Sequence, residues 1–384
     1  MSRQRFCELK SFLRFDDTLR RDRNDSLAPV RKTTDHFLLR LREFVTAPEY
    51  LTVDEQLLEF HGRVKFRQYI ASKPGKFGIK IYWISSSGGE YVFNGLVYIG
   101  AGSINDSFVR DSAGHGEAVV KQLIDPFLDN GRNVTLDNFF TSVHLADDLR
   151  ARNTTLVGTV RRNNRSVPSV ANDVTGRTKG DSRYYFSDSK MLCSFWDKGN
   201  KPVLLLDTFK PTVSSAEEQN AAKPSTVQFY NATKSGVDII DKKVRAFSCK
   251  RKCRRWPFAV VCNFLDISCI NGSFIFNKVH GQSNDRLSFL ISCGYQLVDS
   301  QIKSRMRIPK ALKEEVVMAM RLCGYKTESH VHTAPTKLLQ KPRRCEMCPT
   351  KADRKSKSVC GICKKVICVE HSVKVCISCC EKDD

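Results

Sequence analysis

The chain has 384 residues and carries 63 Lys and Arg against 41 Asp and Glu, which gives a formal net charge of +22 and an isoelectric point near 9.4. Hydrophobic residues make up 41% and charged residues 27%, values that are ordinary for globular proteins and exclude a wholly disordered chain. A positive surplus of this size favours a polyanionic partner, either nucleic acid or an anionic membrane surface.

The longest apolar stretch, 258–276, is interrupted by Asn263, Asp266 and Asn271. Charges and amides in the middle of a membrane span are costly in lipid, so we predict a core helix and no membrane partner. We expect no secretory leader, because residues 1–10 are already polar and charged.

The first 46 residues have the spacing of two helices. Apolar residues recur three and four positions apart within 6–13 and again within 37–45. Residues 22–28 are a polar loop, and Pro29 suits the first turn of the second helix.

From residue 50 onward the pattern is that of a mixed α/β domain. It predicts strands over 51–57, 77–84 and 90–100, a helix over 117–129, a strand over 133–137, a helix over 141–152 and a strand over 155–161. Three strands followed by helix, strand, helix and strand is the order of an RNase H-like α/β core.

The remainder predicts an insertion, three helices and a Cys-rich end. Strands are expected at 183–186, 191–196 and 202–208, then a basic helix from Gly236, an apolar helix opened by Pro257 and an amphipathic helix over 309–323. The predicted division is a helical region (1–50), the first part of the core (51–161), a β-rich insertion (162–225), the second part of the core with helices (226–325), a linker (326–344) and a zinc-binding domain (345–384).

Four aspartates are candidates for binding Mg²⁺. Asp54 lies in the first core strand, Asp137 ends a short strand, and Asp238 and Asp241 lie one helical turn apart on one face. Three or four carboxylates can hold a pair of Mg²⁺ ions, because each ion takes only one or two. The alternatives are a helix cap for Asp137, a helix-dipole partner for Asp238 and a merely solvated Asp241.

A dense basic stretch follows these acids. Eight basic residues and no acid lie between positions 242 and 255, namely Lys242, Lys243, Arg245, Lys250, Arg251, Lys252, Arg254 and Arg255. A solvated face and a nuclear import signal are the alternatives to phosphate contact, which we favour because like charges this dense repel unless a polyanion neutralises them. A second strip supports phosphate contact and comprises Arg63, Lys65, Arg67, Lys73, Lys76 and Lys80.

Half of the 16 cysteines lie between positions 345 and 380. Seven of these eight cysteines and one histidine form four ligand pairs, Cys345 and Cys348, Cys360 and Cys363, Cys368 and His371, and Cys376 and Cys379. Eight such ligands suffice for two tetrahedral Zn²⁺ sites, which would supply folding energy that so short a module lacks. Disulfides are the alternative, disfavoured by the histidine within the pattern. Cys380 is a spare or alternative ligand.

Several of these segments resemble the piggyBac transposase family. The resemblance rests on Met1 to Phe6, Thr52-Val-Asp-Glu-Gln-Leu57, Ser72-Lys-Pro-Gly-Lys-Phe-Gly-Ile-Lys80, the segments 134–142 and 157–161, Tyr230-Asn231, Gly236-Val-Asp-Ile-Ile-Asp241, Arg255-Trp-Pro257 and the Cys-rich tail. It covers nearly all of the chain. It implies a DDE/D recombinase with two Mg²⁺ ions, replaceable by Mn²⁺, whose catalytic triad is Asp54, Asp137 and Asp238, with Asp241 as a supporting carboxylate.

The resemblance implies that residues 1–50 are part of a helical dimerisation and DNA-binding region. It also implies what the protein acts on. The expected reaction is cleavage at the ends of a DNA element through a hairpin intermediate and joining to TTAA target sites, by a nuclear homodimer that binds double-stranded DNA. In the terminal module, resemblance to cross-brace folds implies that Cys345 and Cys348 share one Zn²⁺ with Cys368 and His371. Cys360 and Cys363 would share the other with Cys376 and Cys379.

Two further functions stay open. The chain begins where the N-terminal region of the family is already under way, so we expect a truncated, degenerate or domesticated copy. The alternative function is therefore a transposase-derived nuclear protein that binds DNA or chromatin without cutting it. A ubiquitin ligase built on the zinc module is a third possibility, which the sixth position of the histidine disfavours.

Overall fold

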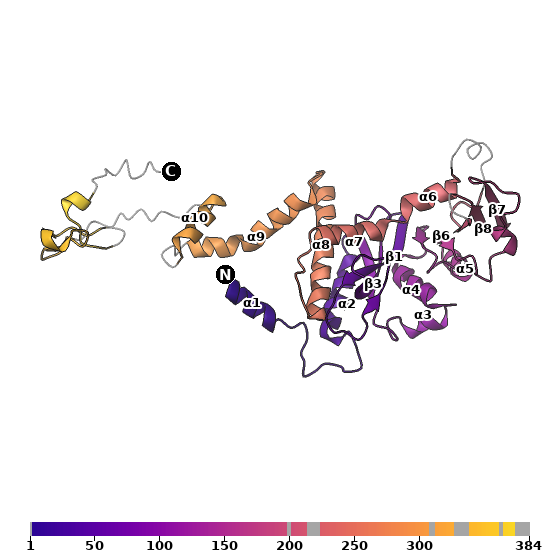
Figure 1. Ribbon diagram of the computed structural model, residues 1–384, viewed down its shortest axis with the longest axis horizontal. Coiled ribbons are helices and arrows are strands. Elements are labelled where there is room, and N and C mark those ends of the chain that lie inside the picture. The colour runs from indigo at the N-terminus through magenta and orange to yellow at the C-terminus, as the bar shows by residue number, and fades with distance from the viewer. Residues whose placement is uncertain are drawn as a thin grey trace. The chain divides into compact units, whose positions relative to one another are not determined.

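The computed structural model describes residues 2–197, 201–212, 223–306, 312–325, 338–360 and 364–372. The chain divides into two compact units, residues 1–291 and residues 292–384. The first unit contains a large mixed sheet with helices on both faces, drawn in indigo to pink in Figure 1. The second contains two helical segments and a small Cys-rich module.

Nine of the described strands form one sheet. In chain order they are β1 Tyr50–Glu59, β2 Gln68–Tyr69, β3 Phe77–Ser86, β4 Val92–Val97, β5 Asn133–Leu136, β6 Thr155–Val160, β7 Ser182–Ser187, β8 Lys190–Phe195 and β9 Val203–Asp207. Their order across the sheet is β2-β3-β1-β5-β6-β9-β8-β7, with β4 also paired to β3. The central strands β1, β5 and β6 are parallel, whereas β3 and β9 run antiparallel to their neighbours β1 and β6. The three strands predicted within 162–225 therefore extend the main sheet.

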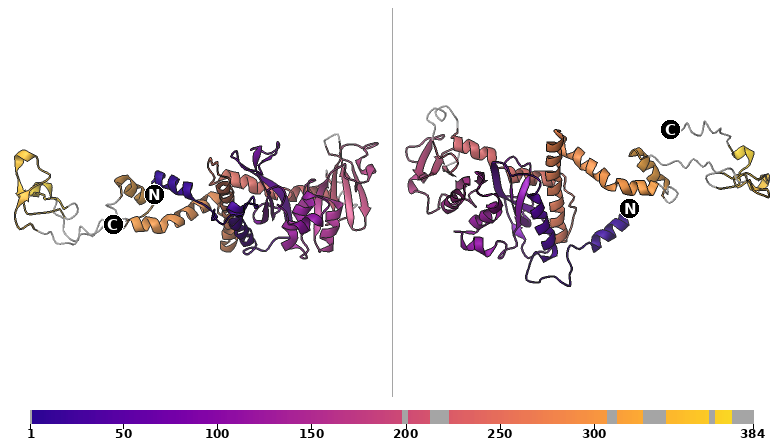
Figure 2. Two further views of the ribbon diagram at one scale, coloured as in Figure 1. Left: turned by 90° about the horizontal axis from the view of Figure 1, so that it is seen from below. Right: turned by 180° about the vertical axis from the view of Figure 1, so that it is seen from behind.

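The helices of the described residues are α1 Arg3–Phe12, α2 Arg31–Leu41, α3 Asp106–Arg110, α4 His115–Ile124, α5 Val143–Ala151, α6 Ser225–Thr233, α7 Gly236–Ala246, α8 Trp256–His280, α9 Arg286–Met306 and α10 Glu314–Leu322. Figures 1 and 2 show α4 on one side of strands β1 and β3, and α2, α7 and α8 on the other. Successive side chains of a strand point to opposite faces, so β3 supplies both cores. Tyr82 and Ile84 pack with α4 and α5, while Ile81 and Trp83 pack with α2, α7 and α8.

The predicted order of strands and helices from 51 to 161 is confirmed. The helix predicted over 117–129 is shorter, because Pro126 falls in a 3₁₀ turn over Asp125–Phe127 that follows α4. Strand β2 and helices α3, α6 and α9 were not predicted. Strand β2 has two residues, α3 and α6 are short, and α9 has scattered polar positions. Gly324 has φ of 82° just after α10, as expected for a helix-terminating glycine.

Helix α8 is long and apolar enough to cross a membrane by length and composition, which alone is weak evidence for a span. Its polar residues instead have specific partners in the first unit. The Asn271 side chain bonds both backbone groups of Val92 at 2.9 Å, and the Asp266 carboxylate accepts hydrogen bonds from the Ser248 hydroxyl and the Cys249 amide. These bonds support the predicted core helix.

Candidate active site

Two of the predicted acidic residues lie on neighbouring parallel strands. Strand β1 pairs with β5 so that Thr52 is opposite Thr135, and Asp54 and Asp137 each lie two residues further along the chain. The hydroxyls of Thr52 and Thr135 both donate hydrogen bonds to Thr233 at the end of α6, at 2.6 and 2.8 Å. Because side chains two residues apart in a strand share a face, this register directs the two carboxylates toward the face that α6 and α7 cover.

Asp137 directly follows β5 and begins a tight turn. Its carboxylate accepts the backbone N–H of Phe139 at 2.8 Å, and its carbonyl accepts the Thr141 hydroxyl at 2.8 Å. The N-cap of α5 is Ser142, whose hydroxyl accepts the amide of Leu145 at 3.0 Å. The helix cap considered for Asp137 is therefore supplied by Ser142.

Asp238 reaches the same region from the first turn of α7. This helix begins at Gly236, and a methyl group there would lie 2.4 Å from the carbonyl oxygen of Ser86 and 3.1 Å from the hydroxyl of Thr52. Only a residue without a side chain allows such a close approach to β1 and β3. The contact places Asp238, with a side chain that is 61% exposed, near enough to Asp54 for the two carboxylates to repel each other.

Several carboxylates lie close together in this site, and burial and their mutual repulsion disfavour the charged forms. Burial and the neighbouring Glu55 carboxylate, with a smaller contribution from Asp238, raise the pKa of Asp54 to about 8. Burial also raises the pKa of Asp137, although the amides of Phe139 and Phe140 oppose the shift. Carboxylates held together at such cost are characteristic of functional sites and of sites for cations.

The donor set fits a hard divalent cation. All three groups are carboxylates, the ligands that Mg²⁺ and Mn²⁺ prefer. Within the described residues, the aspartate oxygens do not all come within 4.8 Å of one another, as tightly grouped ligands would.

Lys73 also lies in this site. Its side chain is 16% exposed, and its ammonium lies 3.3 Å from Asp238 Oδ1, 3.8 Å from Glu55 Oε1 and 3.1 Å from the Glu55 carbonyl. Burial opposes the charged form, but the carboxylates of Asp54, Asp238 and Glu55 outweigh it and raise the pKa of Lys73. The site therefore contains a charged ammonium among its acids.

Asp241 has different surroundings from Asp238. Its side chain is 8% exposed, and its two oxygens accept hydrogen bonds from Gln56 at 3.0 Å and Arg245 at 2.8 Å. Gln56 also accepts hydrogen bonds from Trp83 and Asn263, both at 2.9 Å. This network connects α7 and α8 to the sheet. Asp241 therefore holds α7 against strand β1 through Gln56.

Some residues of the basic stretch donate hydrogen bonds to backbone carbonyls, whereas others are exposed without a carboxylate partner in the part of the chain that the structure describes. Lys243 donates to the Gly89 carbonyl at 2.7 Å, Arg251 to the Ser248 carbonyl and Arg255 to the Lys10 carbonyl, both at 2.9 Å, while Lys250 donates to the Glu59 carbonyl. Lys242, Lys252 and Arg254 are exposed and have no carboxylate partner among the described residues. These three retain their charges for an external anion.

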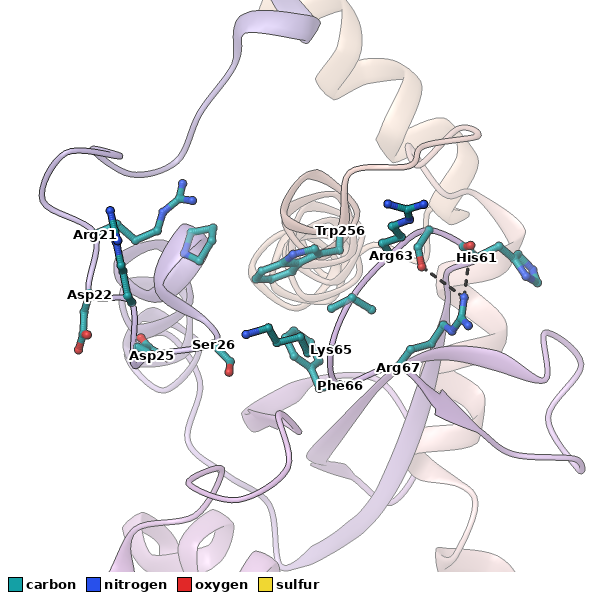
Figure 3. Close-up of a pocket in the computed structure, with 14 residues that line it drawn as sticks. Arg21, Asp22, Asp25, Ser26, His61, Arg63, Lys65, Phe66, Arg67 and Trp256 are labelled. Atoms are coloured by element: carbon teal, nitrogen blue, oxygen red, sulfur yellow. Dashed lines mark hydrogen bonds between the residues drawn. The ribbon is translucent and has the colours of Figure 1, made fainter.

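A basic cavity of about 720 Å³ lies between the loop preceding α2, the segment after β1 and the start of α8. Figure 3 shows Arg63, Lys65 and Arg67 around it, with the Trp256 ring in its wall. Arg67 is held by the carbonyls of His61 and Gly62 at 3.4 and 3.3 Å. In the described part of the chain, no carboxylate forms an ion pair with Arg63, Lys65 or Arg67, so the cavity carries uncompensated positive charge.

In the second unit, four Cys and His ligands of the terminal module lie together. The ligand atoms of Cys345, Cys348, Cys368 and His371 all lie within 4.8 Å of one another. The Cys348 and Cys368 sulfurs are 3.7 Å apart, and Nδ1 of His371 lies 3.3 to 3.7 Å from the three sulfurs. Zn²⁺ bonds of about 2.3 Å in a tetrahedron give sulfur separations of this size.

This cluster is consistent with a zinc module and contains the first of the two predicted ligand sets. A two-stranded sheet, β10 Arg343–Arg344 with β11 Lys355–Ser356, leads into it. Of the second predicted set, Cys363, Cys376 and Cys379 lie outside the described residues, as does Cys380. The described residues thus account for one zinc site.

Comparison with known proteins agrees with this arrangement. A family model described as Transposase IS4 matches residues 1–273. The fold is similar to the piggyBac transposase in the cryo-EM structure of its synaptic complex with hairpin DNA, with a TM-score of 0.79 and 36% sequence identity, over 99% of this chain and 80% of that one. The chain belongs to the piggyBac family of DDE transposases.

Two human relatives are more distant. PiggyBac transposable element-derived protein 3 of Homo sapiens is 24% identical over 272 residues, which are 67% of this chain and 45% of that protein. PiggyBac transposable element-derived protein 2 of Homo sapiens is 23% identical over 334 residues, or 82% of this chain and 55% of that protein. The chain therefore spans about half the length of these relatives.

Sequence reasoning missed a second ionic cluster of this piggyBac-family chain. The buried Glu117 carboxylate on α4 accepts hydrogen bonds from Ser142 at 2.7 Å, His144 at 2.6 Å and Lys121 at 3.0 Å. These bonds connect α4 to the end of the turn that begins at Asp137. Although Glu117, His144 and Asp148 have the spacing of metal ligands, the Lys121 ammonium contacts both carboxylates and offsets one of their two negative charges.

Lys73 and Glu55 were also not assigned to the site. In the sequence Lys73 is one of several basic residues in a loop, and Glu55 is adjacent to a stronger candidate. The half-buried position of Lys73 depends on the fold of the loop between β2 and β3, which brings its ammonium to Glu55 of β1. The Pro-Gly pair within Ser72-Lys-Pro-Gly-Lys76 was the signal available in the sequence. It predicts a turn with a defined backbone, from which the side chain of Lys73 points in a fixed direction.

Proposed function

We propose that the chain is a metal-dependent DDE transposase that cleaves DNA strands and transfers their ends to TTAA target sites. The observation that carries this proposal is the direction of Asp54, Asp137 and Asp238 toward one face of a sheet, in a chain of this family. The arrangement of strands and helices supports an RNase H-like core as the scaffold. Basic residues around the site would hold the negatively charged substrate.

Each residue has a distinct part in this proposal. Asp54, Asp137 and Asp238 would hold two Mg²⁺ ions, for which Mn²⁺ could substitute. When bound, these ions activate the attacking oxygen and stabilise the leaving oxygen of a phosphodiester. Gly236 and the Asp241 network keep α7 close to β1, which holds Asp238 in place. Glu117, through Ser142, steadies the turn that carries Asp137.

The proposed partner is double-stranded DNA, bound at the ends of an element and at its target. The similar piggyBac transposase was solved with hairpin DNA, and this chain has exposed Lys242, Lys252 and Arg254 beside α7. Phosphate contacts of this kind position a duplex and release counterions. A homodimer acting in the nucleus, with a second Zn²⁺ held by Cys360, Cys363, Cys376 and Cys379, completes the proposal.

The basic cavity in Figure 3 is expected to contribute to DNA affinity. Charge reversal in an Arg63→Glu/Lys65→Glu variant should weaken duplex binding by at least about tenfold at moderate salt. It should also reduce the slope of log affinity against log salt by roughly 2, because about one counterion is released per phosphate contact. Fluorescence anisotropy over a salt series measures both quantities.

The matched control reverses two exposed basic residues, Arg165 and Lys179, near the opposite edge of the sheet. This control should bind DNA nearly as tightly as the wild type. Equal losses in the two variants would show that overall charge, and not the cavity, determines affinity.

The elevated pKa of Asp54 predicts a specific pH dependence of stability. Folding raises this pKa to about 8, from about 3.9 in an unfolded chain, so the folded state holds the extra proton between these values. The free energy of unfolding should therefore fall as pH rises from about 4 to about 8.

Thermal unfolding without added divalent ions tests this prediction. Between pH 5 and pH 8 the melting temperature of the wild type should fall further than that of Asp54→Asn, which has no proton to lose at this position. Parallel curves for the two proteins would contradict the assignment. Added Mg²⁺ should reduce the fall in the wild type, because it stabilises the ionised carboxylate.

A second function is favoured by one observation, namely the ammonium of Lys73 beside Asp238. A protein that keeps this ion pair permanently would bind DNA without cutting it. The deciding experiment measures, on one preparation, the binding of a TTAA-containing duplex and the nicking of supercoiled plasmid with Mg²⁺, Mn²⁺ or EDTA. Nicking that depends on divalent ions supports the transposase, whereas binding without nicking supports the DNA-binding protein.

A further inference from the structure

Lys73 has a largely covered side chain, 16% exposed, and its ammonium is paired with the carboxylates of Asp238 and Glu55. Its loop is defined by backbone hydrogen bonds from Lys73 to Ile70 at 3.2 Å, from Lys76 to Lys73 at 3.0 Å and from Ile70 to Lys76 at 2.8 Å. The loop therefore delivers the ammonium to a definite place. Lys76, in the same loop, is exposed and has no ion-pair partner among the residues that the structure describes.

The ammonium has two sets of partners. One is Asp238, at 3.3 Å, which is a proposed ligand of the divalent ions. The other is Glu55, which offers a carbonyl at 3.1 Å and a carboxylate at 3.8 Å. Glu55 is not one of the proposed metal ligands, so it can hold Lys73 after Asp238 has been released.

A divalent ion and this ammonium compete for the same oxygen. Mg²⁺ needs its carboxylate oxygens at about 2.1 Å, and a neighbouring ammonium donating to the same group lowers the negative charge that attracts the ion. Without an ion, however, unpaired acids repel one another in a partly buried site. Lys73 relieves that repulsion between Asp54 and Asp238.

We propose that Lys73 is a positioning residue that occupies the Asp238 side of the cation site in the metal-free protein and withdraws to Glu55 when a divalent ion binds. This inference rests on the proposed function, because it assumes that the carboxylates bind divalent ions. In this proposal the Ser72–Lys76 turn holds Lys73 beside the carboxylates and stabilises the site when no ion is bound. The same ammonium lowers the affinity of the site for divalent ions.

Mn²⁺ binding to the DNA-free full-length chain, followed by the electron paramagnetic resonance of free Mn²⁺, tests the proposal. Sites that the Asp54→Asn/Asp137→Asn variant loses are assigned to the carboxylates. Lys73→Met keeps the aliphatic length but not the charge, and should bind Mn²⁺ at these sites roughly tenfold more tightly than the wild type. Lys73→Arg, which keeps the charge, should bind no more tightly, and Lys76→Met should match the wild type.

A purely structural lysine would behave differently. Its loss would loosen the site, so Lys73→Met would bind Mn²⁺ equally or more weakly, and that outcome overturns the inference while leaving the proposed function intact. If neither the wild type nor Lys73→Met binds Mn²⁺ at these carboxylates, both proposals fall. Thermal unfolding provides a second readout, in which Mn²⁺ should raise the melting temperature of Lys73→Met more than that of the wild type.

Discussion

Replacing Asp137 by asparagine is expected to reduce Mg²⁺-dependent plasmid nicking by at least about 10³-fold, because several kcal/mol of transition-state stabilisation depend on the ions it helps to hold. The local structure should survive this change. The asparagine carbonyl can still accept the Phe139 amide that the Asp137 carboxylate accepts at 2.8 Å. The variant therefore removes a negative charge with little disturbance of the turn.

The control for this experiment is Asp188→Asn. Asp188 is exposed in the turn between β7 and β8 with φ of 49°, a conformation that asparagine tolerates well. Nicking by this variant should equal that of the wild type. DNA affinity should be retained in both variants, and nicking by Asp137→Asn at the wild-type rate would remove Asp137 from the proposed site.

Loss of zinc is expected to unfold the terminal module. Cys368 is 7% exposed and lies among Cys345, Cys348 and His371, in a module with few buried apolar side chains. Metal binding supplies much of the folding free energy of such modules, of the order of 10 kcal/mol or more. Cys368→Ser, or chelation of the wild type, should therefore make the module rapidly cleavable by trypsin while the sheet unit resists.

Zinc content measured by mass spectrometry separates one site from two. The wild type should hold two Zn²⁺ per chain if the outlying cysteines form the second proposed site, and one if they do not. Cys7→Ser, which changes an exposed cysteine of α1, should keep the full content. Unchanged zinc content in Cys368→Ser would contradict the assignment of this ligand set.

The sequence was most informative where local spacing governs the chemistry. The register of an apolar strand places Asp137 at the end of β5, and pairs of cysteines separated by two residues bring their sulfurs together. Both are short-range consequences of backbone geometry. That Cys345 and Cys348 share one site with Cys368 and His371, a pair distant from them in the chain, came from a resemblance to known modules. The structure shows these four ligands gathered.

The direction in which a side chain points in the folded protein does not follow from spacing along the chain. Asp238 and Asp241 share one helical face by spacing, yet the first is open and the second is buried against Gln56 and Arg245. The difference arises because α7 crosses β1 at Gly236 and turns its later residues toward α8. No local pattern contains that crossing.

The sequence by itself thus determined the acidic residues, the order of strands and helices in the core, the basic surplus and the zinc-type ligands, because these depend on composition and on spacing along the chain. Only the tertiary structure decided that Lys73 enters the acidic site, that Glu117 supports the turn after Asp137 and that strands β7 to β9 continue the main sheet. The reason is physical, since each of these features depends on packing between segments that are far apart in sequence.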